Sequence, residues 1–154
     1  MTTTMLNQTV TDFELPATTG TTFKLSNYQG KTLIVYFYPK DNTPGCTMEA
    51  QSFTQLKGEF EALGINIIGV SADNEASHRK FHESCGLGID LISDTTKSLH
   101  NKFEVIGEKK NYGKIYVGTI RSTFLVSDKG IILKAWRNVK VNGHAEKVLR
   151  EVKG

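Results

Sequence analysis

Two runs rich in apolar residues mark the centre of the expected fold. Residues 32–38, TLIVYFY, are almost all apolar, β-branched or aromatic, which is typical of a strand buried on both faces, and Pro39 ends the run. Residues 65–70, INIIGV, are apolar apart from Asn66 and predict a second buried strand. Between the two runs, apolar residues recur at helical spacing and a glycine follows them as a stop signal: Phe53, Leu56, Phe60, Leu63 and Gly64.

The remaining segments alternate between strand and helix signals. The expected elements are an N-terminal hairpin of residues 13–15 and 22–25, a helix at 76–84, a strand at 89–92, a helix at 97–103, a long polar loop at 104–117, strands at 121–126 and 131–136, and a helix at 143–152. This order predicts an α/β fold with a mixed central β-sheet flanked by helices, in a single domain of residues 1–154. A thioredoxin-like fold fits the order, although other α/β sandwiches share it.

Composition and charge narrow the class of protein without identifying it. The chain has 154 residues, of which 38% are hydrophobic and 23% charged, and a net charge of +3. Because this weak charge is dispersed along the chain, we expect no nucleic-acid partner. No stretch approaches the ~20 apolar residues of a transmembrane helix, so we expect no membrane partner. Two cysteines, Cys46 and Cys85, are too few for a secreted disulfide framework, which predicts a reducing, cytoplasmic compartment.

The segment that joins the first buried strand to the next helix carries the candidate chemistry. Thr43 is a good N-cap and Pro44 is favoured at the first helical position, so Cys46 falls in the first turn. A thiolate at this point gains unpaired backbone N–H groups and the positive end of the helix dipole. The thiolate is the nucleophilic form of cysteine, which makes Cys46 a candidate nucleophile. The alternative is that Cys46 is a small core residue.

The run FYPKDNTPGCTMEA at residues 37–50 resembles the peroxiredoxin active-site motif P-x-x-x-T-x-x-C. More narrowly, it resembles the bacterioferritin-comigratory-protein branch, also called peroxiredoxin Q. Other stretches agree in the family's order: DFELP, IGVSAD, LISD, GEKKNYGKIYVG and RSTFLVSDKG. The resemblance therefore spans nearly the whole chain. It implies a thioredoxin-like fold and a thiol-dependent peroxidase that reduces hydrogen peroxide and organic hydroperoxides with neither a cofactor nor a metal.

The resemblance also implies a role for each of five residues. Cys46 is the peroxidatic cysteine, which peroxide oxidises to a sulfenic acid. The hydroxyl of Thr43 hydrogen-bonds the thiolate or the peroxide. Arg121 stabilises the thiolate and the charge on the leaving oxygen. Pro39 shapes and shields the pocket, and Glu49 orients a polar network, although strand termination and a favourable helix-dipole position explain these two residues equally well.

One position departs from the pattern of the branch. Many members carry a resolving cysteine five positions after the peroxidatic one, and here that position is Gln51. Another subgroup keeps it on the next helix, at the position of His82, about one turn before Cys85. Cys85 is therefore a candidate resolving cysteine or a core residue. The resemblance implies a hydroperoxide substrate, a thioredoxin, glutaredoxin or small-thiol reductant, and a monomer or weak dimer.

Alternative functions remain open at this point. A thioredoxin-like disulfide oxidoreductase needs a C-x-x-C pair, but the residue three positions after Cys46 is Glu49. A redox sensor or chaperone on the same fold is not distinguished by the sequence. His78 and His82 lie four apart on an expected helix and lack a third metal ligand, so we expect two solvated histidines rather than a metal site.

Overall fold

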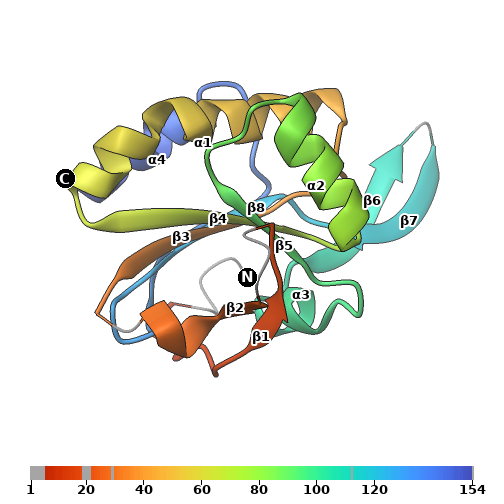
Figure 1. Ribbon diagram of the computed structural model, residues 1–154. Helices are drawn as coiled ribbons and strands as arrows, with labels where there is room; N and C mark the ends of the chain where they lie inside the picture. Colours follow the sequence, from red (N-terminus) through yellow and green to blue (C-terminus); the bar gives the residue numbers. More distant parts are fainter. Residues whose placement is uncertain (1–5, 19–21, 29, 112, 154) are drawn as a thin grey trace.

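A computed structural model describes residues 6–18, 22–28, 30–111 and 113–153 (Figure 1). Among these residues, no helix is both long and apolar enough to cross a bilayer. The helices and strands are β1 (Glu14–Pro16), β2 (Thr22–Lys24), the 3-10 turn η1 (Leu25–Tyr28), β3 (Thr32–Phe37), α1 (Pro44–Ala62), β4 (Ile65–Ser71), α2 (Glu75–Ser84), β5 (Asp90–Ser93), α3 (Ser98–Lys102), β6 (Ile106–Asn111), β7 (Lys114–Thr119), β8 (Ser122–Val126), β9 (Ile132–Trp136) and α4 (His144–Lys153).

The central sheet has five strands in the order β5-β4-β3-β8-β9. Strands β3, β4 and β5 run parallel to one another, and β8 is antiparallel to both β3 and β9. Helices α1, α2 and α4 cover one face, whereas the β1–β2 hairpin and α3 lie against the other (Figure 1). The expected α/β class, with a mixed sheet flanked by helices and an N-terminal hairpin, is confirmed; Thr19 and Gly20 of the expected hairpin turn lie outside the described residues.

Strand β3 contributes side chains to both apolar cores. Ile34 and Tyr36 face the helices and share a buried cluster with Cys46. Leu33 and Phe37 face the opposite side, where they pack in a second cluster with α3 and the N-terminal hairpin. Because both faces of the strand are covered, every position from 33 to 38 is buried, which explains the uninterrupted apolar run.

Gly69 in β4 permits a close approach between neighbouring strands. A Cβ at this position would lie 2.8 Å from Cζ of Tyr36 and 3.0 Å from Cδ2 of Leu91. These distances are too short for a side chain, so the packing requires glycine. The ring of Tyr36 also stacks on Phe53 of α1 with centroids 4.8 Å apart, which fixes α1 over the sheet.

The N-terminal segment pairs with both edge strands of the central sheet. The backbone N–H of Asn7 donates to the carbonyl of Ile132 at the start of β9. At the other edge, the N–H of Thr18 donates to the carbonyl of Leu91 in β5. The chain between these two contacts therefore crosses the face of the sheet opposite α1.

The segment expected to be a polar loop, residues 104–117, contains most of a β-hairpin instead. Strands β6 and β7 pair antiparallel from Ile106↔Thr119 to Asn111↔Lys114, and the ribbon projects from the body (Figure 1). The prediction of a loop was wrong because β7 is exposed along most of its length. Such a ribbon lacks the alternation of buried and solvated positions that identifies a strand in sequence.

Candidate active site

Cys46 is the third residue of α1, as the sequence predicts. Thr43 occupies the N-cap position in an extended conformation, and Pro44 is the first helical residue. Cys46 is buried, with 1% of its surface exposed. The core alternative is therefore partly right, because Cys46 packs in the apolar cluster between α1 and the sheet. Its position in the first turn also gives the sulfur the electrostatic setting of a helix start.

Thr43 closes the loop before the helix. Its hydroxyl donates to the carbonyl of Lys40 at 2.9 Å rather than accepting a bond from the helix backbone or contacting Cys46. Its own carbonyl accepts from the N–H of Thr47 at 2.8 Å. Thr43 therefore sets the shape of the turn from which α1 begins. Pro39 lies at the bend after β3 and is half-buried, in keeping with its expected role as a strand end.

Arg121 reaches Cys46 from the residue just before β8. Its Nη2 donates to Sγ of Cys46 at 3.3 Å, and its Nη1 donates to Oε1 of Glu49 at 2.7 Å. The N–H of Val139 donates to the carbonyl of Arg121, which anchors its backbone. Burial alone lowers the pKa of Arg121, but the negative charges of Glu49 and Cys46 outweigh burial and raise it. The guanidinium is therefore a permanent cation beside the sulfur.

Glu49 is buried one turn after Cys46 on the same helix. Its carboxyl is fully enclosed, and Oε2 finds no hydrogen-bond partner among the described residues. Burial raises the pKa of Glu49 to about 7, although the charge of Arg121 works in the opposite direction. Near neutral pH the carboxyl is therefore distributed between its neutral and charged forms. The structure brings Cys46, Glu49 and Arg121 together, as the resemblance implies.

The two cysteines are separate free thiols. Cys85 is the C-cap residue of α2 and is half-buried, and its side chain packs against the same cluster that contains Cys46. Gln51, in the position of the local resolving cysteine of many relatives, is exposed on α1. A shallow groove of about 510 Å³ runs along this exposed side of α1 and is lined by Asn42, Pro44, Thr47, Met48, Gln51, Ser52 and Gln55. Cys46 lies on the inward side of the helix.

One polar feature beside this site was not predicted from the sequence. His78 was expected in solvent, but it is 1% exposed and binds Asp41 in the loop before α1. The expectation was wrong because His78 lies three residues from Phe81, on the buried face of α2. That spacing was the available signal, since residues three apart share one face of a helix.

A family model described as the AhpC/TSA family matches residues 6–135. The chain belongs to this family. Peroxiredoxin Bcp of Bacillus subtilis is 45% identical over 148 residues, which cover 96% of this chain and 94% of that protein. A structure of the Xanthomonas campestris bacterioferritin comigratory protein has a TM-score of 0.86 and 45% identity, and the match covers 92% of this chain and 90% of that one.

A cysteine mutant of Xylella fastidiosa PrxQ is also similar over nearly the whole chain. Its TM-score is 0.91 at 39% identity, and the match covers 96% of this chain and 94% of that one. The AhpC/TSA protein described here is therefore a peroxiredoxin of the Bcp, or PrxQ, branch with a thioredoxin-like fold. Its activity is that of a thiol-dependent peroxidase.

Proposed function

We propose that Cys46 is the residue that peroxide attacks and that Arg121, Thr43, Glu49 and Pro39 form its site. The observation that carries the proposal is the 3.3 Å hydrogen bond from Arg121 to Sγ of Cys46 in the first turn of α1. A fixed cation and a helix start both favour the thiolate over the thiol. Arg121 is itself held by Glu49, so its guanidinium is oriented before any substrate arrives.

The proposed reaction is a displacement at oxygen. An electron pair of the Cys46 thiolate forms an S–O bond to one peroxide oxygen as the O–O bond breaks. The other oxygen leaves with the bonding pair and takes a proton from solvent to become water or an alcohol. Cys46 becomes a sulfenic acid, the first step of the cysteine oxidation ladder. The guanidinium of Arg121 stabilises the negative charge on the departing oxygen. A thiol then displaces the sulfenic oxygen as water and forms a disulfide with Cys46, and a second thiol reduces that disulfide. The two thiols together supply the two electrons and two protons that restore the Cys46 thiol.

We propose hydrogen peroxide and organic hydroperoxides as substrates. The Xanthomonas campestris relative was studied for its alkyl peroxide reduction activity, which supports an organic hydroperoxide. Thr43 forms the loop that precedes Cys46 and offers a hydroxyl that can turn toward a bound peroxide. Pro39 would shield the sulfur from bulk water at the end of β3.

We propose Cys85 as the resolving thiol and thioredoxin as the reductant of the resulting disulfide. Cys85 and Cys46 pack against one apolar cluster, and the chain has no third cysteine. Without that disulfide, glutaredoxin or a small thiol would reduce the sulfenic acid directly. We further propose a single-domain cytoplasmic protein that acts as a monomer or weak dimer and has neither a nucleic-acid nor a membrane partner, because its charge is weak and dispersed.

The test is a peroxide-consumption assay of Cys46→Ser with a thiol reductant present. The variant should fold normally. Because serine lacks a thiolate, the variant should lose turnover. Cys85→Ser is the matched control in a single-turnover measurement, because it removes the other thiol and should leave the first oxidation of Cys46 intact. Turnover by Cys46→Ser within a few-fold of wild type would reject the proposal. Such turnover would mean that a group other than Cys46 reduces the peroxide.

A further inference from the structure

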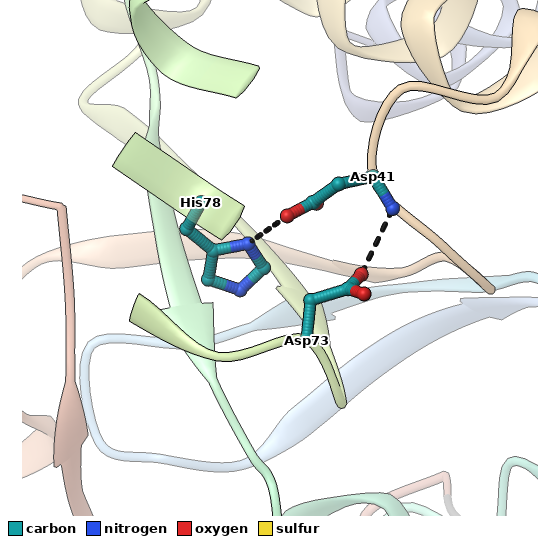
Figure 2. Close-up of side chains that lie close together, drawn as sticks. All are labelled: Asp41, Asp73 and His78. Atoms are coloured by element: carbon teal, nitrogen blue, oxygen red, sulfur yellow. Dashed lines mark hydrogen bonds and ion pairs between the residues drawn. The ribbon is translucent and has the colours of Figure 1, made fainter. Parts of the chain in front are cut away.

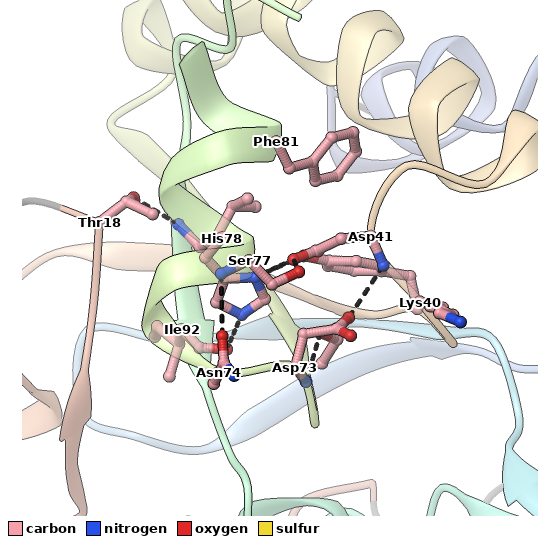
Figure 3. Close-up of polar contacts among 12 residues, drawn as sticks. Thr18, Lys40, Asp41, Asp73, Asn74, Ser77, His78, Phe81 and Ile92 are labelled. Atoms are coloured by element: carbon pink, nitrogen blue, oxygen red, sulfur yellow. Dashed lines mark hydrogen bonds and ion pairs between the residues drawn. The ribbon is translucent and has the colours of Figure 1, made fainter. Parts of the chain in front are cut away.

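A buried polar network joins the start of α2 to the loop that precedes α1 (Figures 2 and 3). Its centre is Asp41, which is 5% exposed. Oδ2 of Asp41 accepts from Nδ1 of His78 and from the hydroxyl of Ser77, each at 2.7 Å. Oδ1 accepts from the hydroxyl of Tyr38, also at 2.7 Å. Three donors from β3's end and α2 therefore hold one carboxylate.

The backbone of Asp41 is held from a second direction. Its N–H donates to Oδ2 of Asp73 at 2.8 Å, and the same oxygen accepts from the hydroxyl of Ser71 at 2.7 Å. Ser71 ends β4, and Asp73 lies in the connection from β4 to α2. Both the side chain and the main chain of Asp41 are thus fixed to neighbouring elements.

Each ring nitrogen of His78 has a polar partner within hydrogen-bond distance. Its Nε2 lies 2.9 Å from the carbonyl oxygen of Ile92, which can only accept, so Nε2 carries a proton. Burial raises the pKa of Asp41, but hydrogen bonds from His78 and Tyr38 outweigh burial and leave it below its ordinary value. Asp41 is therefore an anion, and Nδ1 of His78 donates to it. These bonds together fix the orientation of the His78 ring and of the Asp41 carboxylate.

Asp41, Asp73 and His78 also have ligand atoms within 4.8 Å of one another, a spacing compatible with a metal ion. Both nitrogens of His78 and the converging oxygens of both carboxylates already take part in hydrogen bonds within the protein. A metal would have to displace the protons of His78 and break these bonds. The arrangement therefore fits a structural clamp better than a metal site.

The clamp is close in the chain to the candidate nucleophile. Asp41 and Asn42 form the turn before Thr43, and the hydroxyl of Thr43 bonds back to Lys40. The N-cap carbonyl of Thr43 then accepts the first helical bond from Thr47. Because this turn is continuous with the residue before Cys46, a shift of Asp41 changes the position of Sγ relative to Arg121.

We propose that His78 is a positioning residue for peroxide reduction: by holding Asp41, it fixes the loop of residues 39–43 and thereby the Cys46 sulfur against Arg121. This inference rests on the proposed role of Cys46. It also gives α2 two separate tasks. The first turn of α2 holds the loop of residues 39–43, which precedes Cys46, whereas Cys85 directly follows the last residue of α2.

Two substitutions of His78 separate its two hydrogen bonds. The amide nitrogen of His78→Asn can stand where Nδ1 stands and can still donate to Asp41. The longer amide of His78→Gln reaches toward the position of Nε2, so it retains the bond to Ile92 and loses the one to Asp41. We expect His78→Gln to slow oxidation of Cys46 by about 10- to 100-fold, as for other misplaced reacting groups, and His78→Asn to stay within about threefold of wild type.

The measurement uses a Cys85→Ser background, in which Cys46 is the only thiol. Ultraviolet absorbance gives the thiolate fraction against pH, and the alkylation rate gives its reactivity without any peroxide. The matched control is His100→Gln. His100 is also fully buried and its Nδ1 binds Asp94 at 2.6 Å, but it packs in the opposite core against Phe37. His100→Gln should lower the melting temperature and leave the thiolate fraction and the alkylation rate of Cys46 unchanged.

Ser77→Ala supplies a second variant in case the histidine variants unfold. It removes one donor to Asp41 from the half-buried side of α2, and Ser84→Ala on the same helix is its control. Ser77→Ala should slow alkylation and oxidation by about threefold or more relative to Ser84→Ala, as expected when a reacting group is displaced slightly.

Equal reactivity of Cys46 in His78→Gln and His78→Asn would overturn the inference. If those variants do not fold, equal reactivity in Ser77→Ala and Ser84→Ala would overturn it. Neither result bears on Cys46 itself. If Cys46→Ser instead keeps its peroxidase activity, the proposed function fails, whatever the His78 variants show.

Discussion

The guanidinium of Arg121 donates to the sulfur of Cys46 at 3.3 Å, although 75 positions separate the two residues in the chain. The same guanidinium holds Glu49 through its other terminal nitrogen at 2.7 Å. One cation is therefore shared between two groups that each carry a negative charge when deprotonated. The electrostatic field at the sulfur therefore depends on the protonation state of Glu49. For this reason Arg121 and Glu49 are the first residues to substitute.

Replacing Arg121 should reduce both the thiolate fraction of Cys46 and its reaction with peroxide. Arg121→Met removes the donor to the sulfur and the charge that stabilises the departing oxygen, so we expect the second-order rate constant to fall by about 100-fold or more. Stopped-flow mixing with hydrogen peroxide measures the rate, and ultraviolet absorbance measures the thiolate.

Lys109→Met is the control for Arg121→Met. Lys109 is a second cation in this region, but its ammonium donates to the carbonyl of Thr119 rather than to Cys46. Loss of the Lys109 ammonium should change the second-order rate constant by only a few-fold. An equal loss of rate in the two variants would mean that general positive charge, rather than the bond to the sulfur, drives the reaction.

Glu49 should make the protein less stable as pH rises toward neutrality. Its pKa is about 7 in the folded protein and near 4.5 in the unfolded chain, so the folded state binds the extra proton. The stability from this proton is complete below pH 4.5 and is lost as pH rises through about 7. Glu49→Gln removes the effect. The difference in the free energy of unfolding between wild type and Glu49→Gln should therefore change by up to about 3 kcal/mol over this pH range.

Denaturant unfolding at a series of pH values measures this difference in the free energy of unfolding. His144, whose pKa burial lowers to about 4, gives a slope of opposite sign in both proteins and cancels in the comparison. Parallel pH profiles for wild type and Glu49→Gln would show that Glu49 remains charged in the folded protein.

One equivalent of peroxide should produce a disulfide between Cys46 and Cys85. A disulfide requires Cα atoms within about 7 Å, and the two residues lie at the start of α1 and just after α2. Local unwinding of a helix end costs far less than global unfolding, so the bond should form with a local rearrangement. Non-reducing peptide mass spectrometry detects the cross-link, and Cys46→Ser should lack it. A free Cys85 beside sulfenic or sulfinic Cys46 would establish a one-cysteine cycle.

Adding a methyl group at Gly69 should destabilise the fold. Gly69→Ala brings a Cβ to 2.8 Å from Tyr36 across two packed strands, and overpacking of this kind costs about 1–3 kcal/mol. Gly58→Ala in the middle of α1 is the control. A Cβ at Gly58 has nothing within 4 Å, so the substitution should stabilise the helix by about 0.5–1 kcal/mol. Thermal unfolding distinguishes the two, and equal melting temperatures would contradict the close packing.

Local signals account for what the sequence predicts well. The buried strand β3 is a continuous apolar run, and β4 is apolar apart from Asn66 and Ser71. The start of α1 is encoded by adjacent residues, so Cys46 was identifiable as a first-turn cysteine. The contact of Arg121 with Glu49 spans 72 positions, and local periodicity carries no information on it. The family resemblance implied that Arg121 stabilises the Cys46 thiolate and that Glu49 orients a polar network, but it did not pair Arg121 with Glu49. The bond between Asp41 and His78 spans 37 positions, and neither local periodicity nor the family resemblance predicted it.

The N-terminal segment has a consequence for association with other chains. By pairing with β5 and with the start of β9, residues 7–18 occupy hydrogen-bonding groups at which a foreign strand could otherwise dock. Farther along β9, Lys134 supplies a charge of the kind that discourages edge-to-edge aggregation. If residues 7–18 detached, both edge strands of the central sheet would be exposed at once. Strands of other molecules could then pair with either edge. Tight docking of residues 7–18 therefore protects the protein from polymerisation.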